Sequence, residues 1–201
     1  MAEGEGQPQD VSSHDYHRTV IGYHGTTTAT AERLVGGHPF EPSENDDDWL
    51  GRGIYFWEYA PKQAWWWAET FKRHNNAAVV GAIIRLGHCF DLLDPVNVQV
   101  LKEFHRNSIE KWRESGFEIP QNGNQHKKLD CAIFNLLYSS ERHPPIETTR
   151  AVYVPTASAR RVWRRSWIYE QAHIQISIRK AENILAVWPV RRDGRYGKDA
   201  E

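Results

Sequence analysis

The stretch from Asp48 to Ala68 carries the residue types of a pocket for a planar molecule. Gly51 and Gly53 precede a short apolar run that contains Tyr55, and three consecutive tryptophans, residues 65–67, follow in a segment with a helical pattern. Glycine lets the backbone come close to a ligand, and an aromatic ring offers a flat face for stacking on a heterocycle. The alternative is that these rings pack in the core, as most aromatic side chains at such spacing do.

His24 is a second residue whose position suits ligand binding. A β-branched run over 19–23 predicts a strand, and the segment 29–35 predicts a helix closed by two glycines. His24, Gly25 and Thr26 are therefore expected where the strand turns into the helix. Strand ends open onto crevices and a helix N-terminus has free N–H groups, so such a junction commonly contacts ligands.

Near the end of the chain, residues 172–178 alternate between polar and apolar side chains, which predicts a half-buried strand. One face would carry His173, Gln175 and Ser177, and the other face three isoleucines. Glu170 lies just before this strand.

A basic and aromatic segment precedes that strand. It contains Trp163, Trp167 and four arginines, Arg160, Arg161, Arg164 and Arg165. Arginine and tryptophan together suit phosphate contact and base stacking on single-stranded nucleic acid. A solvated, salt-bridged loop with extended arginines is an equally good interpretation.

Composition excludes several function classes. Lys plus Arg number 25 against 26 Asp plus Glu, so the net charge of −1 creates no global field for nucleic acid or membranes. Cys89 and Cys131 lie in apolar runs and are expected to be buried thiols, and no ligand spacing indicates a metal site. Motifs of dinucleotide-binding folds, P-loops and nucleophile elbows are missing. We find neither a signal peptide nor a spanning apolar run, so we expect a cytoplasmic protein without membrane contact.

The element pattern predicts an α+β domain. Residues 1–19 are expected to be a disordered leader, 20–190 one folded domain and 191–201 a polar tail. Further predicted strands are 53–57, 77–86 with a short continuation at 89–93, 150–154 and 183–187. Further predicted helices are 61–71, 95–116 and 125–139. Strands do not alternate strictly with helices, which favours α+β over a doubly wound sheet.

The order of two motifs resembles the ADP-ribosyltransferase fold of the diphtheria-toxin and poly(ADP-ribose) polymerase branch. The motifs are His24–Thr26, a His-Gly-Thr, and Gly51–Phe56, a Gly-x-Gly-Ile-Tyr-Phe, about 30 residues apart. The resemblance covers about residues 20–188 and implies a split antiparallel β-sheet core with peripheral helices, and NAD as the substrate. It also implies a second stacking aromatic eleven positions after Tyr55, which is Trp66.

The resemblance further implies roles for these residues. His24 would donate a hydrogen bond to a ribose hydroxyl, and the Gly25 backbone would hold the nicotinamide carboxamide. Tyr55 and Trp66 would stack on the two faces of the nicotinamide, with Gln63 close to its amide. A polar group beside the ribose favours the positive charge that develops when nicotinamide leaves.

The family uses a glutamate for that polar group, and this chain departs from the pattern. His173 occupies the equivalent position, with Gln175 beside it and Glu170 upstream. Three interpretations stay open: Glu170 supplies the carboxylate, His173 or Gln175 supports transfer without it, or the pocket only binds NAD or ADP-ribose. Without the glutamate, mono-ADP-ribosyl transfer is expected rather than chain elongation. An RNA 2′-phosphotransferase of related fold is a further alternative.

The resemblance places a loop near the acceptor where the four arginines lie. The acceptor would be an unidentified nucleic acid or protein. A small transferase of this kind is expected to act as a bacterial toxin with a neutralising antitoxin, which rests on analogy alone.

Overall fold

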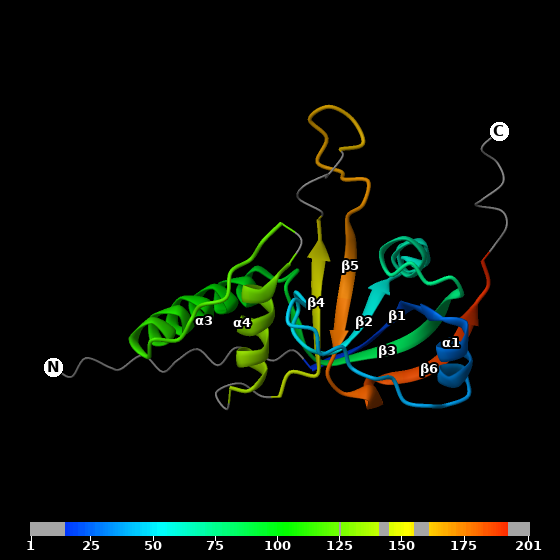
Figure 1. The fold of residues 1–201 in the computed structure, drawn as a ribbon, viewed down its shortest axis with the longest axis horizontal. Coiled ribbons are helices and arrows are strands. Elements are labelled where there is room, and N and C mark those ends of the chain that lie inside the picture. Colours follow the sequence, from blue (N-terminus) through cyan, green and yellow to red (C-terminus); the bar gives the residue numbers. More distant parts are fainter. Residues whose placement is uncertain (1–14, 125, 141–144, 155–160, 193–201) are drawn as a thin grey trace.

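The computed structural model describes residues 15–124, 126–140, 145–154 and 161–192 (Figure 1). These residues form an α+β fold with a six-stranded mixed sheet and peripheral helices. The strands are β1 (Asp15–Thr27), β2 (Ile54–Glu58), β3 (Ala77–Asp91), β4 (Thr148–Tyr153), β5 (His173–Ile178) and β6 (Ile184–Val190). The helices are α1 (Thr28–Val35), α2 (Pro61–Trp66), the π-helical turn η1 (Trp67–Phe71), α3 (Pro95–Glu114), α4 (Lys128–Tyr138) and the 3₁₀ turn η2 (Ala181–Asn183).

The strand pairings close a ring. β1 pairs with β2 and with β3, β2 pairs with β5, β5 with β4, and the end of β3 with β4, while β6 extends the sheet along β3. The β3–β4 pairing is parallel and the other pairings are antiparallel. The expectation of an antiparallel core is therefore corrected to a mixed sheet.

The interior of this ring is the main core. It contains side chains of β1, β2, β3 and β5 together with Leu34 of α1 and Phe40. In the late strand, Ile176 and Ile178 point into this core as predicted. Ser177 of the predicted polar face is also buried, with 0% of its surface exposed, so the expectation of a half-buried strand is corrected for the C-terminal half of β5. The isoleucine face fixes the register of β5, since a slip by one residue would turn these isoleucines out of the core.

Two strands differ in extent from the sequence-based expectation. β1 starts at Asp15, so residues 15–19 of the expected leader are paired with β3. β1 also runs on to Thr27, which places His24 within the strand and not at its end. β3 continues through the expected break, where it pairs with the start of β1. Gly87 at this point adopts a φ of 54°, and a Cβ there would meet the Glu147 carboxylate.

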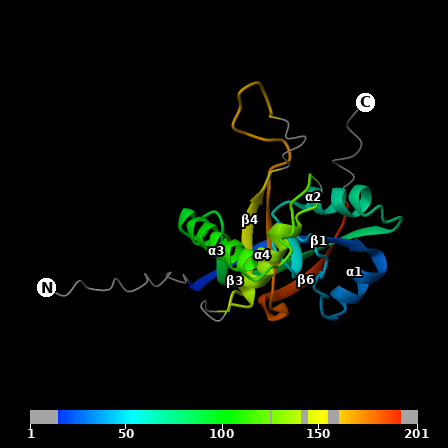
Figure 2. The ribbon, with the colours of Figure 1, turned by 60° about the vertical axis from the view of Figure 1, so that its left-hand side comes forward.

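The helices cover different parts of the sheet. α3 and α4 lie together beside β3 and β4, and α1 lies at the other end of the molecule (Figures 1 and 2). A second core cluster contains residues of β3, β4 and α4 and one residue of the turn before β2: Phe90, Ala151, Phe134, Leu137 and Leu50. The β4–β5 hairpin projects beyond the rest of the sheet and carries a loop at its far end (Figure 1).

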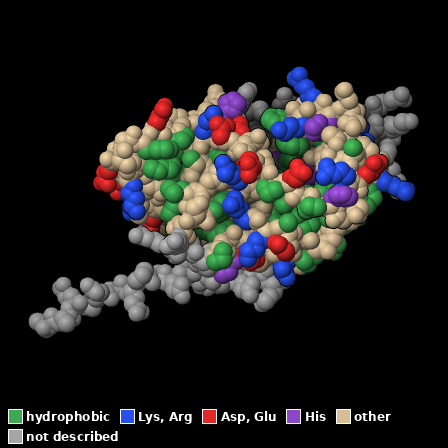
Figure 3. Space-filling model, turned by 60° about the horizontal axis from the view of Figure 1, so that its bottom comes forward, with side chains coloured by type: hydrophobic (Ala, Val, Ile, Leu, Met, Phe, Trp, Pro, Cys, Tyr) green, Lys and Arg blue, Asp and Glu red, His purple; other side chains and the backbone are tan. Residues whose placement is uncertain are grey.

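The surface matches the balanced composition. On the face in Figure 3, basic and acidic side chains are interspersed rather than separated. Within the described part of the chain, no helix combines the length and the apolar character needed to span a bilayer.

Candidate active site

His24 lies on β1, and its ring packs beside two phenylalanines that also contact each other. Its ring centroid is 5.5 Å from that of Phe40 and 5.5 Å from that of Phe56. Nδ1 lies 2.8 Å from the backbone oxygen of Tyr55. A carbonyl oxygen can only accept, so Nδ1 carries a proton, and burial lowers the pKa of His24. The neutral ring therefore presents Nε2 as an acceptor.

A cavity of about 230 Å³ opens against the His24 side chain. Its walls come from α1 and from the segment after it. The lining residues are His24, Thr30, Arg33, Leu34, His38, Pro39, Phe40 and Glu41. The cavity thus combines a buried aromatic ring, an arginine and neutral polar groups, which is the usual composition of a small-molecule site.

Gly25 lets α2 pack directly on β1. A Cβ at this position would lie 2.4 Å from the backbone oxygen of Ala64 and 3.2 Å from Cβ of Ala68. Any larger residue must push α2 outward. The neighbouring Thr26 is buried, with 8% of its surface exposed.

Tyr55 is half-buried on β2 and its hydroxyl is fully engaged. It donates to the backbone oxygen of Gly51 at 2.7 Å and accepts from the backbone N–H of Leu50 at 3.0 Å. Its ring packs on the second core cluster. Burial raises the pKa of Tyr55 far above its usual value, so the phenol does not act as an acid. Tyr55 therefore fixes the turn before β2 and offers only its ring to a ligand.

The tryptophan run divides in two. Trp65 and Trp67 pack with Trp57 in a third core cluster, as expected for packing residues. Trp66 on α2 is 48% exposed, and Gln63 on the same helix is half-buried. No contact between the rings of Tyr55 and Trp66 occurs among the described residues. A nicotinamide slot between the two rings stays a prediction.

His173 and Gln175 belong to a chain of hydrogen bonds that includes Trp49. Trp49 Nε1 donates to Gln175 Oε1 at 2.7 Å, and Gln175 Nε2 lies 3.1 Å from His173 Nε2. His173 Nδ1 lies 2.8 Å from the backbone oxygen of Gln171. The ring of Tyr153 stacks on His173 at 5.1 Å and meets Trp49 edge-on at 5.6 Å.

The donor at one end determines the direction of this chain. The indole N–H can only donate, so it holds Oε1 of Gln175 and turns the amide nitrogen toward His173. The Gln171 carbonyl only accepts, so His173 is protonated at Nδ1 and accepts at Nε2. Burial lowers the pKa of His173, which matches a neutral ring. Sequence reasoning found His173 and Gln175 but missed Trp49 and Tyr153, because only the fold brings these aromatic residues to β5.

The carboxylates divide into an exposed and a paired group. Glu170 lies in the turn before β5 and is exposed. Glu58 and Asp91 are buried and both bind Arg150: Glu58 Oε1 accepts from Nη2 at 2.8 Å and Asp91 Oδ2 from Nη1 at 3.1 Å. The sequence analysis missed this triad, although single charges inside apolar strands are a signal for buried ion pairs.

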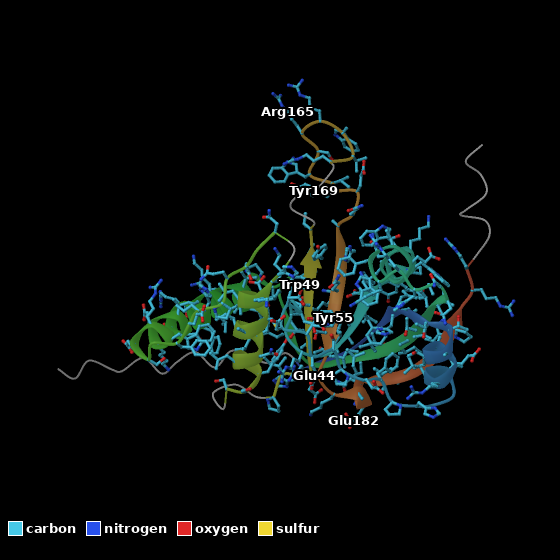
Figure 4. The ribbon with its side chains drawn as sticks, viewed as in Figure 1. Glu44, Trp49, Tyr55, Arg165, Tyr169 and Glu182 are labelled. Carbon is cyan, nitrogen blue, oxygen red and sulfur yellow. The ribbon has the colours of Figure 1, made fainter. Side chains whose placement is uncertain are left out.

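The four arginines predicted to bind the acceptor differ in their environments. Arg160 lies outside the described residues. Arg161 folds back into its own loop, where it donates to the backbone oxygen of Ser166 at 2.5 Å. Arg164 and Arg165 are exposed, and Arg165 lies at the far end of the hairpin (Figure 4).

Metal ligands do not gather among the described residues: no group of three or more His, Cys, Asp or Glu side chains could hold an ion there. Cys89 and Cys131 are free and buried. Burial raises the pKa of the Cys89 thiol to about 12, so it is not a thiolate at neutral pH.

Comparison with known proteins gives one curated relative. The chain is 37% identical over 76 residues to "Uncharacterized protein MJ0359" of Methanocaldococcus jannaschii, a match that covers 35% of this chain and 36% of that protein. The chain thus spans about a third of the length of this relative. No family model and no solved structure matches the chain.

Proposed function

We propose that this protein is an NAD-dependent mono-ADP-ribosyltransferase. One observation carries the proposal: His24, which the sequence motif singles out, is a neutral ring with a free acceptor at the wall of a cavity. In the reaction, the bond between nicotinamide and ribose C1 breaks and nicotinamide leaves with the electron pair. An acceptor atom then donates its lone pair to C1 and releases its proton, which leaves an ADP-ribosylated acceptor.

The residues of the cavity fit part of NAD. Its volume of about 230 Å³ lies below the range of about 300–1,000 Å³ for pockets that enclose drug-sized ligands. It therefore suits one nucleoside of the dinucleotide, with the rest in the open. Arg33 can contact the diphosphate, because its present partner Glu41 is exposed and 3.9 Å away.

His24 takes a role different from the one the resemblance implies. Because Nδ1 already donates to Tyr55, a ribose hydroxyl would donate to His24 Nε2 and not accept from it. A positioned hydroxyl holds the ribose while nicotinamide leaves, and the lost freedom of motion lowers the barrier. The same hydrogen bond to Tyr55 ties His24 to β2.

The polar chain at β5 supports transfer of a single ADP-ribose. Gln175 is held by Trp49 and His173, so its second amide hydrogen has a fixed direction. Neither Gln175 nor neutral His173 supplies the negative charge of a carboxylate, and Glu170 lies outside the strand. The missing carboxylate also favours a second candidate, a module that binds NAD or ADP-ribose without turnover. The RNA 2′-phosphotransferase, the toxin role and the antitoxin stay predictions.

The test uses the full chain with NAD labelled in the adenylate. We expect release of nicotinamide and label in a protein, RNA or DNA fraction of a lysate. His24→Asn keeps a donor near Nδ1 but removes Nε2, so we expect turnover to fall about 10- to 150-fold, the equivalent of about 1.5–3 kcal/mol. His105→Asn, on the remote helix α3, is the control.

Calorimetry with NAD separates the candidates. Binding without nicotinamide release would identify a binding module. If NAD neither binds nor releases nicotinamide, both candidates are refuted. Equal activity of His24→Asn and wild type would show that His24 is not part of the site.

A further inference from the structure

The loop at the end of the β4–β5 hairpin, residues 161–169, has an internal structure of its own. Arg161 and Tyr169 form a β-bridge, and the Arg161 guanidinium lies 5.2 Å from the centre of the Tyr169 ring. The Arg161 guanidinium also donates to Ser166 O at 2.5 Å, and Ser166 N donates to Trp163 O at 3.0 Å. These contacts connect the two ends of this loop, the hairpin-tip loop, and stabilise its turn.

That shape turns its aromatic and cationic side chains outward. Trp163 is 61% exposed and Trp167 is 88% exposed. Arg164 and Arg165 are exposed and pair with no residue that the structure describes. The backbone of Arg165 has a φ of 65°, a conformation that is uncommon outside glycine. Two indoles and two free guanidinium groups thus share the end of one hairpin.

The chemistry of this surface matches a polyanion with planar groups. The loop 161–169 contains three arginines and no acidic residue. Guanidinium groups bind phosphates, and indole faces stack on bases of any sequence. Bases are open to such stacking only where they are not paired, which favours a single strand over a duplex.

The stem of the hairpin argues against a membrane surface. Tyr169, the Tyr153–His173 stack and Trp49 continue the aromatic side chains from the loop toward Tyr55 (Figure 4). At about 3.3 Å per residue, the seven residue-to-residue steps from Ser166 to His173 span at most about 23 Å, enough for several nucleotides. A loop that inserts into a membrane needs aromatic residues only at its tip and not along the stem of the hairpin.

We infer that the hairpin-tip loop binds single-stranded nucleic acid through Trp163, Trp167, Arg164 and Arg165 and leads it along the hairpin toward His173. The identification of this nucleic acid as the acceptor of ADP-ribose rests on the proposed function. The binding of nucleic acid to the loop does not depend on the proposed function.

The experiment is fluorescence anisotropy of the full chain with labelled 20-nucleotide uridine and thymidine homopolymers over a series of salt concentrations. Single strands should bind, and the matching duplex should bind more weakly. R164A/R165A should make the salt dependence shallower, lowering the slope of log K against log salt by about 1.4 for two lost phosphate contacts. Trp163→Ala and Trp167→Ala should each weaken binding about 5- to 150-fold.

Matched controls remove the same groups elsewhere. K102A/R106A removes two exposed cations from α3, and Phe117→Ala removes an aromatic side chain that is 54% exposed. Circular dichroism of each loop variant confirms that it is folded.

The inference is overturned if wild type binds no single strand, if the loop variants bind like the controls, or if the loop variants lose binding to phosphatidylserine vesicles alone. NAD turnover with label on protein only would overturn the acceptor assignment and leave the transferase. Strand binding without nicotinamide release would refute the transferase and leave the binding surface.

Discussion

Trp49→Phe tests whether one indole N–H determines the donor and acceptor directions in the hydrogen bonds that connect Trp49, Gln175 and His173. The substitution keeps an aromatic ring beside Tyr153 and removes the donor that lies 2.7 Å from Gln175 Oε1. With that donor gone, the Gln175 amide can turn over and present Oε1 to His173. The Nε2–H of a protonated His173 could then donate to Gln175 Oε1, whereas the amide nitrogen that faces it in the native protein cannot accept a hydrogen bond.

The energy involved follows from the hydrogen bonds. In the native protein, protonation of His173 Nε2 must either break the Gln175 contact or turn the amide and leave the Trp49 N–H without a partner. A half-buried donor without a partner costs about 1–3 kcal/mol. Trp49→Phe removes this cost, so the pKa of His173 should rise. We also expect about 1 kcal/mol lower stability, from the lost hydrogen bond.

The measurement is an NMR titration of the imidazole nitrogens, which reports both the tautomer and the pKa. Wild type should show the Nδ1–H tautomer of His173 and a pKa below that of a free histidine. Trp49→Phe should raise that pKa, whereas the control Trp112→Phe on α3 should leave it unchanged. An unchanged pKa in Trp49→Phe, or an Nε2–H tautomer in wild type, would refute the reasoning.

Three further perturbations test the framework. Gly25→Ala places a methyl group 2.4 Å from a backbone oxygen of α2, so thermal unfolding should show a loss of about 1–3 kcal/mol, and full stability would contradict the packing. Glu58→Gln leaves the buried Arg150 with one carboxylate and should cost about 3 kcal/mol in urea unfolding, while a neutral result would show that the triad is dispensable. His24 and His173 have lowered pKa values, so the unfolded state takes up more protons below about pH 6.5. Stability should fall as pH drops through that region, and a flat profile would contradict it.

Local patterns were sufficient to predict most elements. The start of β3 at Ala77, the Pro95 start of α3 and the limits of β5 all appear in the structure near their expected positions. These features depend on neighbours in the chain: side-chain period, proline at a first helical turn and β-branched residues. The extents of β1 and β3 were wrong because pairing between these two long strands outweighed the weak local signals at their ends.

The site was predictable only in part, since its geometry depends on pairs that are distant in sequence. His24 stands out by type and position, but its protonation at Nδ1 depends on the backbone of Tyr55 on another strand. The role of Gln175 depends on Trp49, 126 residues away in the chain. Neither pairing leaves a local pattern.

Composition and pattern were enough to predict the α+β class and the balanced charge, and to single out His24, His173 and Gln175 by residue type. Composition and short-range periodicity carry this information. Tertiary contacts determine that the Tyr55 hydroxyl is fully engaged and that β5 presents neutral groups. They also bind Arg161 within its loop and leave Arg164 and Arg165 exposed to a partner. Hydrogen-bond partners and burial set these properties, and both arise when strands far apart in the chain pair.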